Sequence, residues 1–187
     1  MSLLICMGAV SAFAENNKTL GWSLALQNLK SGEMLPFQTP VKSSSGERYR
    51  LIIVPQTNCF YYIIVEEANG NMAVYSTGAL KGGETWQSPT FQLTAPSGTE
   101  TLFVITSLKE QKDLVKRISD FSKNPGVTQR RGLMDELNRL RSQVSKFKET
   151  PEKPVLMGGT IRRKDKEDMG VAFSGQDIYV KTISIEH

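Results

Sequence analysis

The sequence predicts a mainly β protein, a β-sandwich of immunoglobulin-like or related type that carries one inserted helical hairpin. Three observations predict this fold: short apolar runs rich in β-branched and aromatic residues, glycine turns between them, and one stretch with apolar residues at helical spacing. The chain has 187 residues, of which 39% are hydrophobic and 22% are charged. That length and composition suit a single domain with one buried core.

The first fourteen residues have the features of a cleaved export signal. Met1–Ala14 is apolar, carries no charged side chain and ends in Ala12-Phe13-Ala14, just before Glu15. Signal peptidase requires this small-x-small pattern, although the usual basic start is missing. The alternatives are a buried N-terminal element and a lipid anchor at Cys6. We expect export to the periplasm or the cell surface, with residues 15–187 as the mature domain.

Nine runs have the length and residue types of β-strands, and glycine or proline turns separate most of them. They are Trp22–Leu29, Tyr49–Val54, Phe60–Val65, Met72–Tyr75, Thr90–Leu93, Thr101–Thr106, Val155–Ile161, Met169–Phe173 and Ile178–Ile185. Nine strands fit two packed sheets. The strongest turn signal is Asn69-Gly70 between two apolar runs, which predicts a type I′ hairpin turn because both residues tolerate positive φ.

One stretch, from Lys109 to about Glu149, departs from the β pattern and predicts two helices. Its apolar residues recur at steps of three and four, as expected of helices that each bury one face. These residues are Leu114, Ile118, Phe121, Leu133, Leu137, Leu140, Val144 and Phe147. Asn124-Pro125-Gly126 ends the first helix and turns the chain. We expect an antiparallel hairpin, inserted at about 109–149 and docked on the β domain through this apolar stripe.

The predicted hairpin carries the basic excess of the chain. Between Lys109 and Glu149 there are eleven lysines and arginines against six acids, whereas the whole chain has a net charge of +4. A candidate surface for an anion or a partner is formed by Lys116, Arg117, Arg130, Arg131 and Arg139. The alternative is an ordinary solvated face, because acids stand three or four residues from many of these bases. We expect no nucleic acid partner, because no aromatic residues are interleaved with the bases on the polar side of the helices.

The sequence argues against catalysis and against metal or cofactor binding. Its single histidine is His187, the last residue, and a frayed end cannot hold an imidazole between a nucleophile and an acid unless it is docked. Without the first fourteen residues, Cys59 is the remaining cysteine, and its apolar neighbours predict a buried, unreactive thiol. One histidine and one cysteine do not supply the usual zinc ligand set. No further run reaches the roughly 18 apolar residues of a spanning helix, so we expect no transmembrane segment in the mature chain.

Several motifs between Phe37 and Ser107 resemble the bacterial family called domain of unknown function 4384. They are Ser45-Gly46-Glu47-Arg48-Tyr49-Arg50-Leu51, Asn58-Cys59-Phe60-Tyr61-Tyr62-Ile63-Ile64, Asn69-Gly70, Gly83-Glu84 and Ala95-Pro96-Ser97-Gly98-Thr99-Glu100-Thr101-Leu102-Phe103-Val104-Ile105. The resemblance implies a small β domain of exported or surface-linked bacterial proteins, without a defining catalytic residue. It covers less than half of the chain.

The Gly98, Thr99 and Glu100 motif at a strand entry has a structural and a functional interpretation. Gly98 would supply an unusual backbone angle and Glu100 would accept turn N–H groups, or Glu100 would contact a ligand. The function that we expect is a non-catalytic binding or assembly module of the cell envelope, with an unidentified protein or envelope component as partner. The alternatives are a periplasmic hydrolase of unfamiliar type and a peripheral membrane or cell-wall module that uses the basic hairpin.

Overall fold

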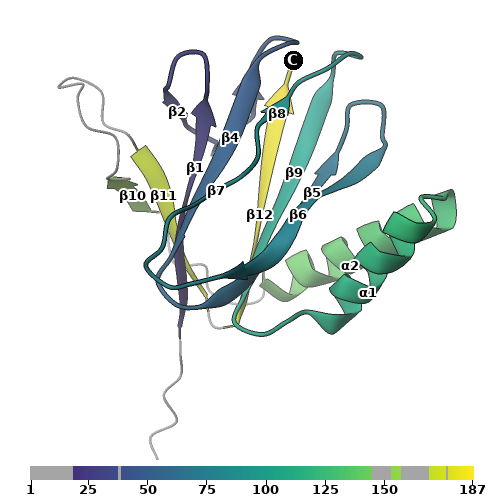
Figure 1. Cartoon of the computed structure of the whole chain (residues 1–187). Helices are drawn as coiled ribbons and strands as arrows, with labels where there is room; N and C mark the ends of the chain where they lie inside the picture. Colours follow the sequence, from purple (N-terminus) through teal and green to yellow (C-terminus); the bar gives the residue numbers. More distant parts are fainter. Residues whose placement is uncertain (1–18, 38, 145–152, 157–168, 176) are drawn as a thin grey trace, which may run out of the picture.

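The structure is a computed structural model that describes residues 19–37, 39–144, 153–156, 169–175 and 177–187. Two β-sheets pack face to face, and two antiparallel helices cover the outer face of one of them (Figure 1). The predicted fold class, a β-sandwich with an inserted helical hairpin, is confirmed.

The first sheet, sheet A, has the strand order β10-β11-β1-β4-β7, with β2 paired to β1 and β8 paired to β4. Its strands are β1 (Leu20–Asn28), β2 (Met34–Leu35), β4 (Arg48–Pro55), β7 (Trp86–Gln87), β8 (Phe91–Gln92), β10 (Lys153–Leu156) and β11 (Met169–Gly175). The longest pairing joins β1 and β4, with Trp22 opposite Pro55 and Asn28 opposite Tyr49. All pairs in this sheet are antiparallel.

The second sheet, sheet B, has the order β3-β12-β9-β5-β6. Its strands are β3 (Val41–Lys42), β5 (Cys59–Glu66), β6 (Met72–Leu80), β9 (Thr99–Ser107) and β12 (Ile178–Glu186). The short β3 runs parallel to β12, and the other pairs are antiparallel. Strand β9 lies at the centre, and seven of its nine residues, Glu100 and Leu102–Ser107, are buried because both faces of sheet B are covered.

Between the sheets lies an aromatic and aliphatic core. Trp22 of sheet A is fully buried and stacks on Phe173 at 4.8 Å between ring centroids. Tyr179 of sheet B contacts both rings, at 5.9 Å from Trp22 and 4.9 Å from Phe173. Large aromatic side chains contribute strongly to burial, so this cluster fixes one sheet against the other.

The helices are α1 (Lys112–Lys123) and α2 (Val127–Val144), and both follow β9 in the chain. Their apolar stripe packs on the outer face of sheet B, in a second core that is separate from the one between the sheets. This core contains Leu114, Phe121, Leu133, Leu137 and Leu140 from the helices, and Tyr62, Ile64, Met72, Phe103 and Ile105 from sheet B, with Ile118 partly buried beside them. The predicted docking is therefore confirmed for six of the eight residues, while the side chains of Val144 and Phe147 lie outside the described residues.

Each of the nine predicted strands overlaps a strand of the structure, with boundaries shifted by up to five residues. The prediction for Val155–Ile161 corresponds to β10 at Lys153–Leu156, and residues 157–168 lie outside the described part of the chain. Sequence reasoning missed β2, β3 and β7, each two residues long. Such short pairs carry no periodic signal, because alternation needs at least four residues to be seen.

The hairpin turn between β5 and β6 was predicted in the right place, but its predicted type and central residues are wrong. The Gly70 amide donates to the Glu67 carbonyl at 2.8 Å, so Ala68 and Asn69 are the central residues of the turn rather than Asn69 and Gly70. Gly70 has φ of +78° and follows that turn. The side-chain oxygen of Asn69 accepts the Asn71 amide at 2.7 Å, which favours this longer connection over the two-residue type I′ turn.

Candidate functional site

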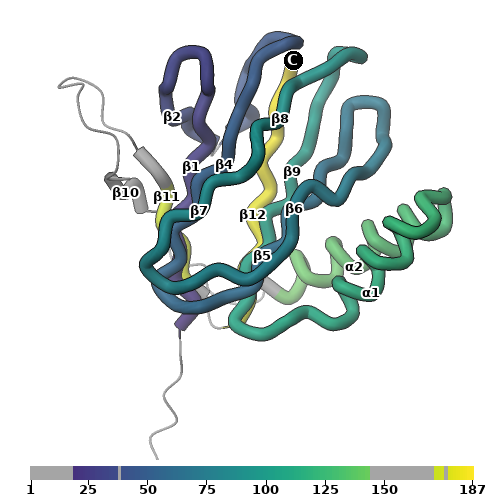
Figure 2. The backbone as a smooth tube through the Cα atoms, viewed as in Figure 1, coloured from purple at the N-terminus to yellow at the C-terminus, as the bar shows by residue number. Residues whose placement is uncertain are grey.

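The only histidine of the chain lies at one end of the sandwich, beside the Gly98 and Glu100 motif. Strand β12 brings the chain end there, to the same end of the sandwich as the tip of the β1–β2 hairpin (Figure 2). His187 and Gly98 exchange backbone hydrogen bonds of 3.0 and 2.8 Å, which extend the β12–β9 pairing by one step. The expectation of a frayed end is therefore wrong, because the central strand β9 holds the last residue in register.

The imidazole of His187 is fully buried, with a side-chain exposure of 0%, and it lies between a serine and a carboxylate. Its Nδ1 is 3.0 Å from Ser45 Oγ, and its Nε2 is 3.4 Å from Glu100 Oε1. Ser97 Oγ lies 3.5 Å from Ser45 Oγ. These residues come from three segments far apart in the sequence, and together they form what we call the Ser45–His187–Glu100 cluster.

Burial raises the pKa of Glu100, and the nearby Glu67 carboxylate raises it further, while His187 lowers it. The 3.4 Å contact is long for a hydrogen bond, and the buried Nε2 of His187 has no hydrogen-bond partner among the described residues. The cluster thus contains the three residue types of a hydrolytic triad, but its acid and imidazole are not joined by the short hydrogen bond that such a triad needs.

The structure gives Gly98 and Glu100 roles that differ from the expected ones. The φ of Gly98 is not in the left-handed region; instead, a Cβ at this position would lie 2.9 Å from the Cβ of Ala68. Glycine is needed because the 94–98 segment crosses close to the β5–β6 turn. Glu100 points to His187 rather than to turn amides. Thr99 is exposed and forms the first residue of β9, where it pairs with Glu186.

A second polar network lies nearby and was not foreseen from the sequence. Glu47 Oε2 accepts hydrogen bonds from the Tyr49 hydroxyl at 2.6 Å, and from Ser43 Oγ and Asn28 Nδ2 at 3.1 Å each. These bonds, with the Tyr49 bond the strongest, lower the pKa of the Glu47 carboxyl. Asn28 also accepts the amides of Lys30 and Ser31, so the network joins the β1–β2 and β3–β4 connections. Its role is structural.

The basic residues predicted to form one surface on the hairpin have different surroundings, and two of them, Arg130 and Arg139, have hydrogen-bond partners in the fold. Arg139 pairs with Glu136 of the same helix through two contacts, Nε to Oε2 at 2.7 Å and Nη2 to Oε1 at 2.5 Å. Arg130 donates to the carbonyl of Gly70 at 2.7 Å, which links α2 to the β5–β6 turn. Lys116 and Arg131 are both exposed, one on each helix.

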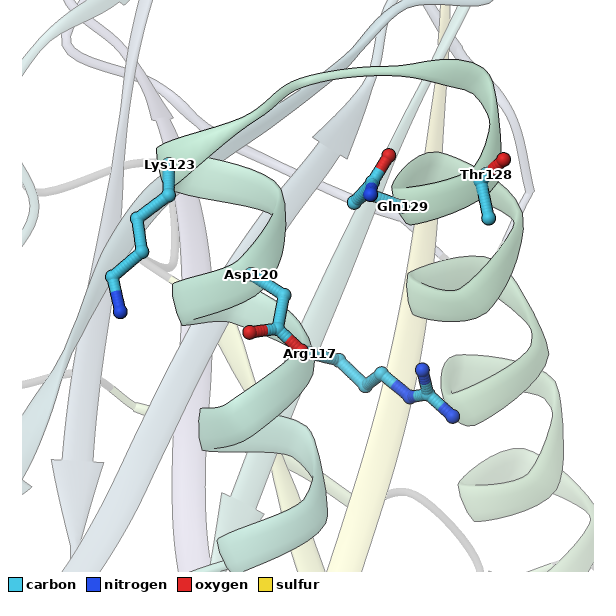
Figure 3. A pocket seen from close by; sticks show the side chains of 5 residues that line it. All are labelled: Arg117, Asp120, Lys123, Thr128 and Gln129. Atoms are coloured by element: carbon cyan, nitrogen blue, oxygen red, sulfur yellow. The ribbon is translucent and has the colours of Figure 1, made fainter.

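Arg117 extends from α1 toward α2 and lines a small cavity near the turn between the helices (Figure 3). This cavity of about 240 Å³ is also lined by Asp120, Lys123, Thr128 and Gln129. The guanidinium lies close to Gly132, where a Cβ would be 3.2 Å from Arg117 Nη1. With Asp120 beside Arg117, the cavity has charges of both signs and does not make a purely basic anion site.

A larger groove lies between the β5–β6 turn and the first turns of α2. It has a volume of about 480 Å³ and is lined by Glu66, Asn69, Gly70, Met72, Val127, Arg130, Arg131, Met134 and Asp135. Val127 is 68% exposed, the highest exposure of any large hydrophobic side chain in the described residues. The groove therefore has three apolar side chains, Met72, Met134 and Val127, with two arginines and two acids around them.

The described residues contain no group of three or more histidine, cysteine, aspartate or glutamate side chains placed to hold a metal ion. Cys59 is buried, and burial raises the pKa of its thiol to about 11. Neither described helix is long and apolar enough to cross a bilayer.

Comparison of the chain with protein-family models, with curated proteins and with solved structures found no match. The resemblance to domain of unknown function 4384 therefore stays a prediction from the motifs.

Proposed function

We propose that this chain is an exported, non-catalytic module of the bacterial envelope that binds a partner protein through the groove between α2 and the β5–β6 turn. The observation that carries the proposal is the exposed apolar side chain of Val127 beside Met72 and Met134 in this groove. Export is inferred from the Met1–Ala14 segment, and the envelope setting from the motifs that resemble domain of unknown function 4384.

The shape and chemistry of the groove suit a protein segment better than a small molecule. Small-molecule sites are enclosed and enriched in apolar lining, whereas this groove is open and has charged side chains at its rim. Protein interfaces combine an apolar centre with a polar rim. Methionine side chains adapt to the shape of a partner, which makes Met72 and Met134 suitable for the centre.

Both walls of the groove are held in place by the fold. Arg130 joins α2 to the β5–β6 turn through the Gly70 carbonyl. Met72 begins β6 and is buried in the second core, so the floor belongs to the sheet. A preformed site loses little conformational freedom on binding, which favours affinity.

The test is quantitative co-purification from the native envelope with the wild-type chain and with Val127→Glu. Glutamate at the first residue of α2 is compatible with the helix dipole, so the variant should fold while its charge blocks the apolar centre. The control is Thr90→Glu, which adds the same charge at an exposed position between β7 and β8. We expect one or a few proteins to be depleted at least tenfold with Val127→Glu and retained with Thr90→Glu. Equal recovery with all three chains would refute the groove as the binding site.

The Ser45–His187–Glu100 cluster favours a second candidate, a hydrolase that uses Ser45 as nucleophile. In that case His187 Nδ1 would accept the Ser45 proton, at the observed 3.0 Å, and Glu100 would orient the ring. The long 3.4 Å contact between Glu100 Oε1 and His187 Nε2 argues against this candidate.

A fluorophosphonate probe separates the two candidates, because it labels activated serines covalently. The non-catalytic proposal predicts no labelling above that of the Ser45→Ala variant. Labelling of the wild-type chain that disappears in both Ser45→Ala and His187→Gln would establish the hydrolase instead.

A further inference from the structure

Strand β6 is a free edge of sheet B. In the strand order β3-β12-β9-β5-β6 it comes last, and β5 is the only described strand that pairs with it. No described turn or loop donates a backbone hydrogen bond to Met72–Leu80 or accepts one from it. Alternate residues of a strand direct their N–H and C=O groups to opposite sides. About half of the backbone groups of this nine-residue strand therefore face away from the sheet, with no described strand beside them.

The other edges of the two sheets carry features that hinder pairing with a further strand. Natural proteins protect their edges with short strands, lysine or proline. Strands β2, β3, β7 and β8 are each two residues long, and Pro89 lies between the last two. Strand β10 begins with Lys153 and Pro154. By contrast, β6 has nine residues, and none of them is charged or proline.

A β-bulge limits the straight part of the β6 edge. Neighbouring residues of β5 pair with Ser76 and with Val74, so Tyr75 is the extra residue on β6. A bulge bends its strand and hinders pairing on the outer side. After the bulge, Ser76–Leu80 pairs with β5 without a further shift in register. This straight segment is therefore the part of β6 that can accept another strand.

The side chains of this segment leave its backbone accessible. Thr77, Gly78 and Ala79 are consecutive and exposed, and all three are small. Between the sheets, the ring of Tyr61 occupies the space beside Gly78, where a Cβ would lie 3.0 Å from the Tyr61 Cε1 atom. The Tyr61 hydroxyl lies 2.9 Å from Ser76 Oγ, and this contact holds the ring in place. The edge at Gly78 is therefore supported from within and presents small, uncharged groups.

We propose that Ser76–Leu80 pairs antiparallel with the same segment of a second copy of this chain, about a twofold axis at Gly78. The groups that complement a sheet edge are those of another extended backbone. Identical edges carry identical charges, so a charged edge would repel its own copy, whereas β6 has no charged residue. Pairing about a twofold axis also closes on itself and leaves neither copy with a free β6 edge. A second copy therefore suits this edge.

The proposed pairing is weak and is separate from the groove beside Val127. Met72, which lines that groove, lies on the other side of the bulge from Ser76–Leu80. A short segment from each copy is much smaller than a stable interface, which contains roughly 20–30 residues per side. We therefore expect a reversible dimer that forms at roughly 10–100 μM protein.

The test is sedimentation velocity of the full chain over a range of about 5–500 μM protein. One edge variant carries Thr77→Lys and Ala79→Lys, and the other carries Thr77→Glu and Ala79→Glu. In the twofold pairing, Thr77 of each copy lies opposite Ala79 of the other. Like charges therefore meet when either variant pairs with itself, and opposite charges meet when the two variants are mixed. The matched control carries Thr85→Lys and Thr90→Lys, at exposed positions outside β6.

We expect the wild-type chain and the control to change from monomer to dimer across this range. Each edge variant alone should dimerise at least about tenfold more weakly, because the dimer would contain two like-charge pairs. An equal mixture of the two edge variants should dimerise at least as tightly as the wild type. Unchanged thermal unfolding of all variants at low concentration shows that folding is intact.

Four results would overturn the proposal. The first is a wild-type chain that stays monomeric at about 500 μM. The second is dimerisation of the edge variants as tight as that of the wild type; because every chain keeps residues 1–14, association through that segment would give this result. The third is an equal loss in the control, which would mean that net charge governs association. The fourth is a mixture of edge variants that stays monomeric, which would exclude the twofold pairing.

Discussion

Replacing Leu137 with alanine tests whether the helical hairpin is part of the folded domain. Leu137 is fully buried in α2, in the second core with Leu133, Leu140 and side chains of sheet B. Replacing a buried leucine with alanine lowers the free energy of unfolding by about 2–5 kcal/mol, because apolar contacts are lost and a cavity remains. For a domain of this size, such a loss lowers Tm by roughly 5–15 °C.

Two spectroscopic probes report separately on the two parts of the molecule. The only tryptophans of the chain, Trp22 and Trp86, are in sheet A, so their fluorescence reports on the sandwich. Far-ultraviolet circular dichroism at 222 nm reports mainly on α1 and α2. In urea titrations, we expect both signals to change together, and both midpoints to fall in Leu137→Ala.

The matched control is Asn138→Ala, the next residue of α2, whose side chain is exposed. This change leaves the second core intact and should alter the free energy of unfolding by less than about 0.5 kcal/mol. If Leu137→Ala leaves the tryptophan transition unchanged while the helical signal is lost at lower urea, then the hairpin is an independent arm. The docked arrangement would be refuted.

Four further predictions concern individual side chains. Alkylation of Cys59 in the folded protein should be slow and should become fast in denaturant, because its thiol is buried and has a pKa of about 11; rapid labelling without denaturant would contradict its burial. The pKa of Glu47 is lowered in the fold, so its contribution to stability is present above its ordinary value of 4.5 and is lost as the pH falls; Glu47→Gln should therefore destabilise the protein at pH 7 more than at pH 3. The pKa of Glu100 is raised in the fold, so its contribution to stability is present below pH 4.5 and is lost as the pH rises. Relative to the wild type, Glu100→Gln should therefore be more favourable for the free energy of unfolding at pH 7 than at pH 4. Urea titrations across this pH range check the signs for both glutamates. Arg130→Ala should lower the free energy of unfolding by about 1 kcal/mol through loss of the bond to the Gly70 carbonyl, whereas Arg131→Ala should have an effect below about 0.5 kcal/mol; equal effects would show that this bond contributes nothing.

The sequence predicted those features of the fold that depend on local pattern. The spacing of Leu114, Phe121, Leu133, Leu137 and Leu140 identified the buried face of both helices, because helical periodicity is a property of neighbouring residues. Burial of Cys59 followed from its apolar neighbours in β5. The pattern did not give the start of α2, which begins at Val127, because its first turn carries one exposed apolar residue and then polar ones.

The contacts at the candidate sites could not be predicted, because they join residues far apart in the chain. Ser45 and His187 are separated by 142 positions, and Arg130 meets Gly70 across 60. No local signal marks such pairs. The same limit applies to Gly98. The sequence suggested that glycine is needed there for an unusual backbone angle, whereas in the structure it is needed because Ala68 lies too close for a side chain. Arg130 and Arg139, two residues of the predicted basic surface, likewise have partners that only the fold reveals.

The central claim is that this chain acts by binding a protein at the groove beside Val127. The most direct measurement is site-specific photo-crosslinking in the native envelope, with a benzoyl-phenylalanine at position 127 or, as a control, at the exposed position 90. We expect a discrete protein adduct from position 127 and none from position 90, because only the former lies in the groove. The absence of an adduct at position 127, or the same adduct from both positions, would contradict the claim.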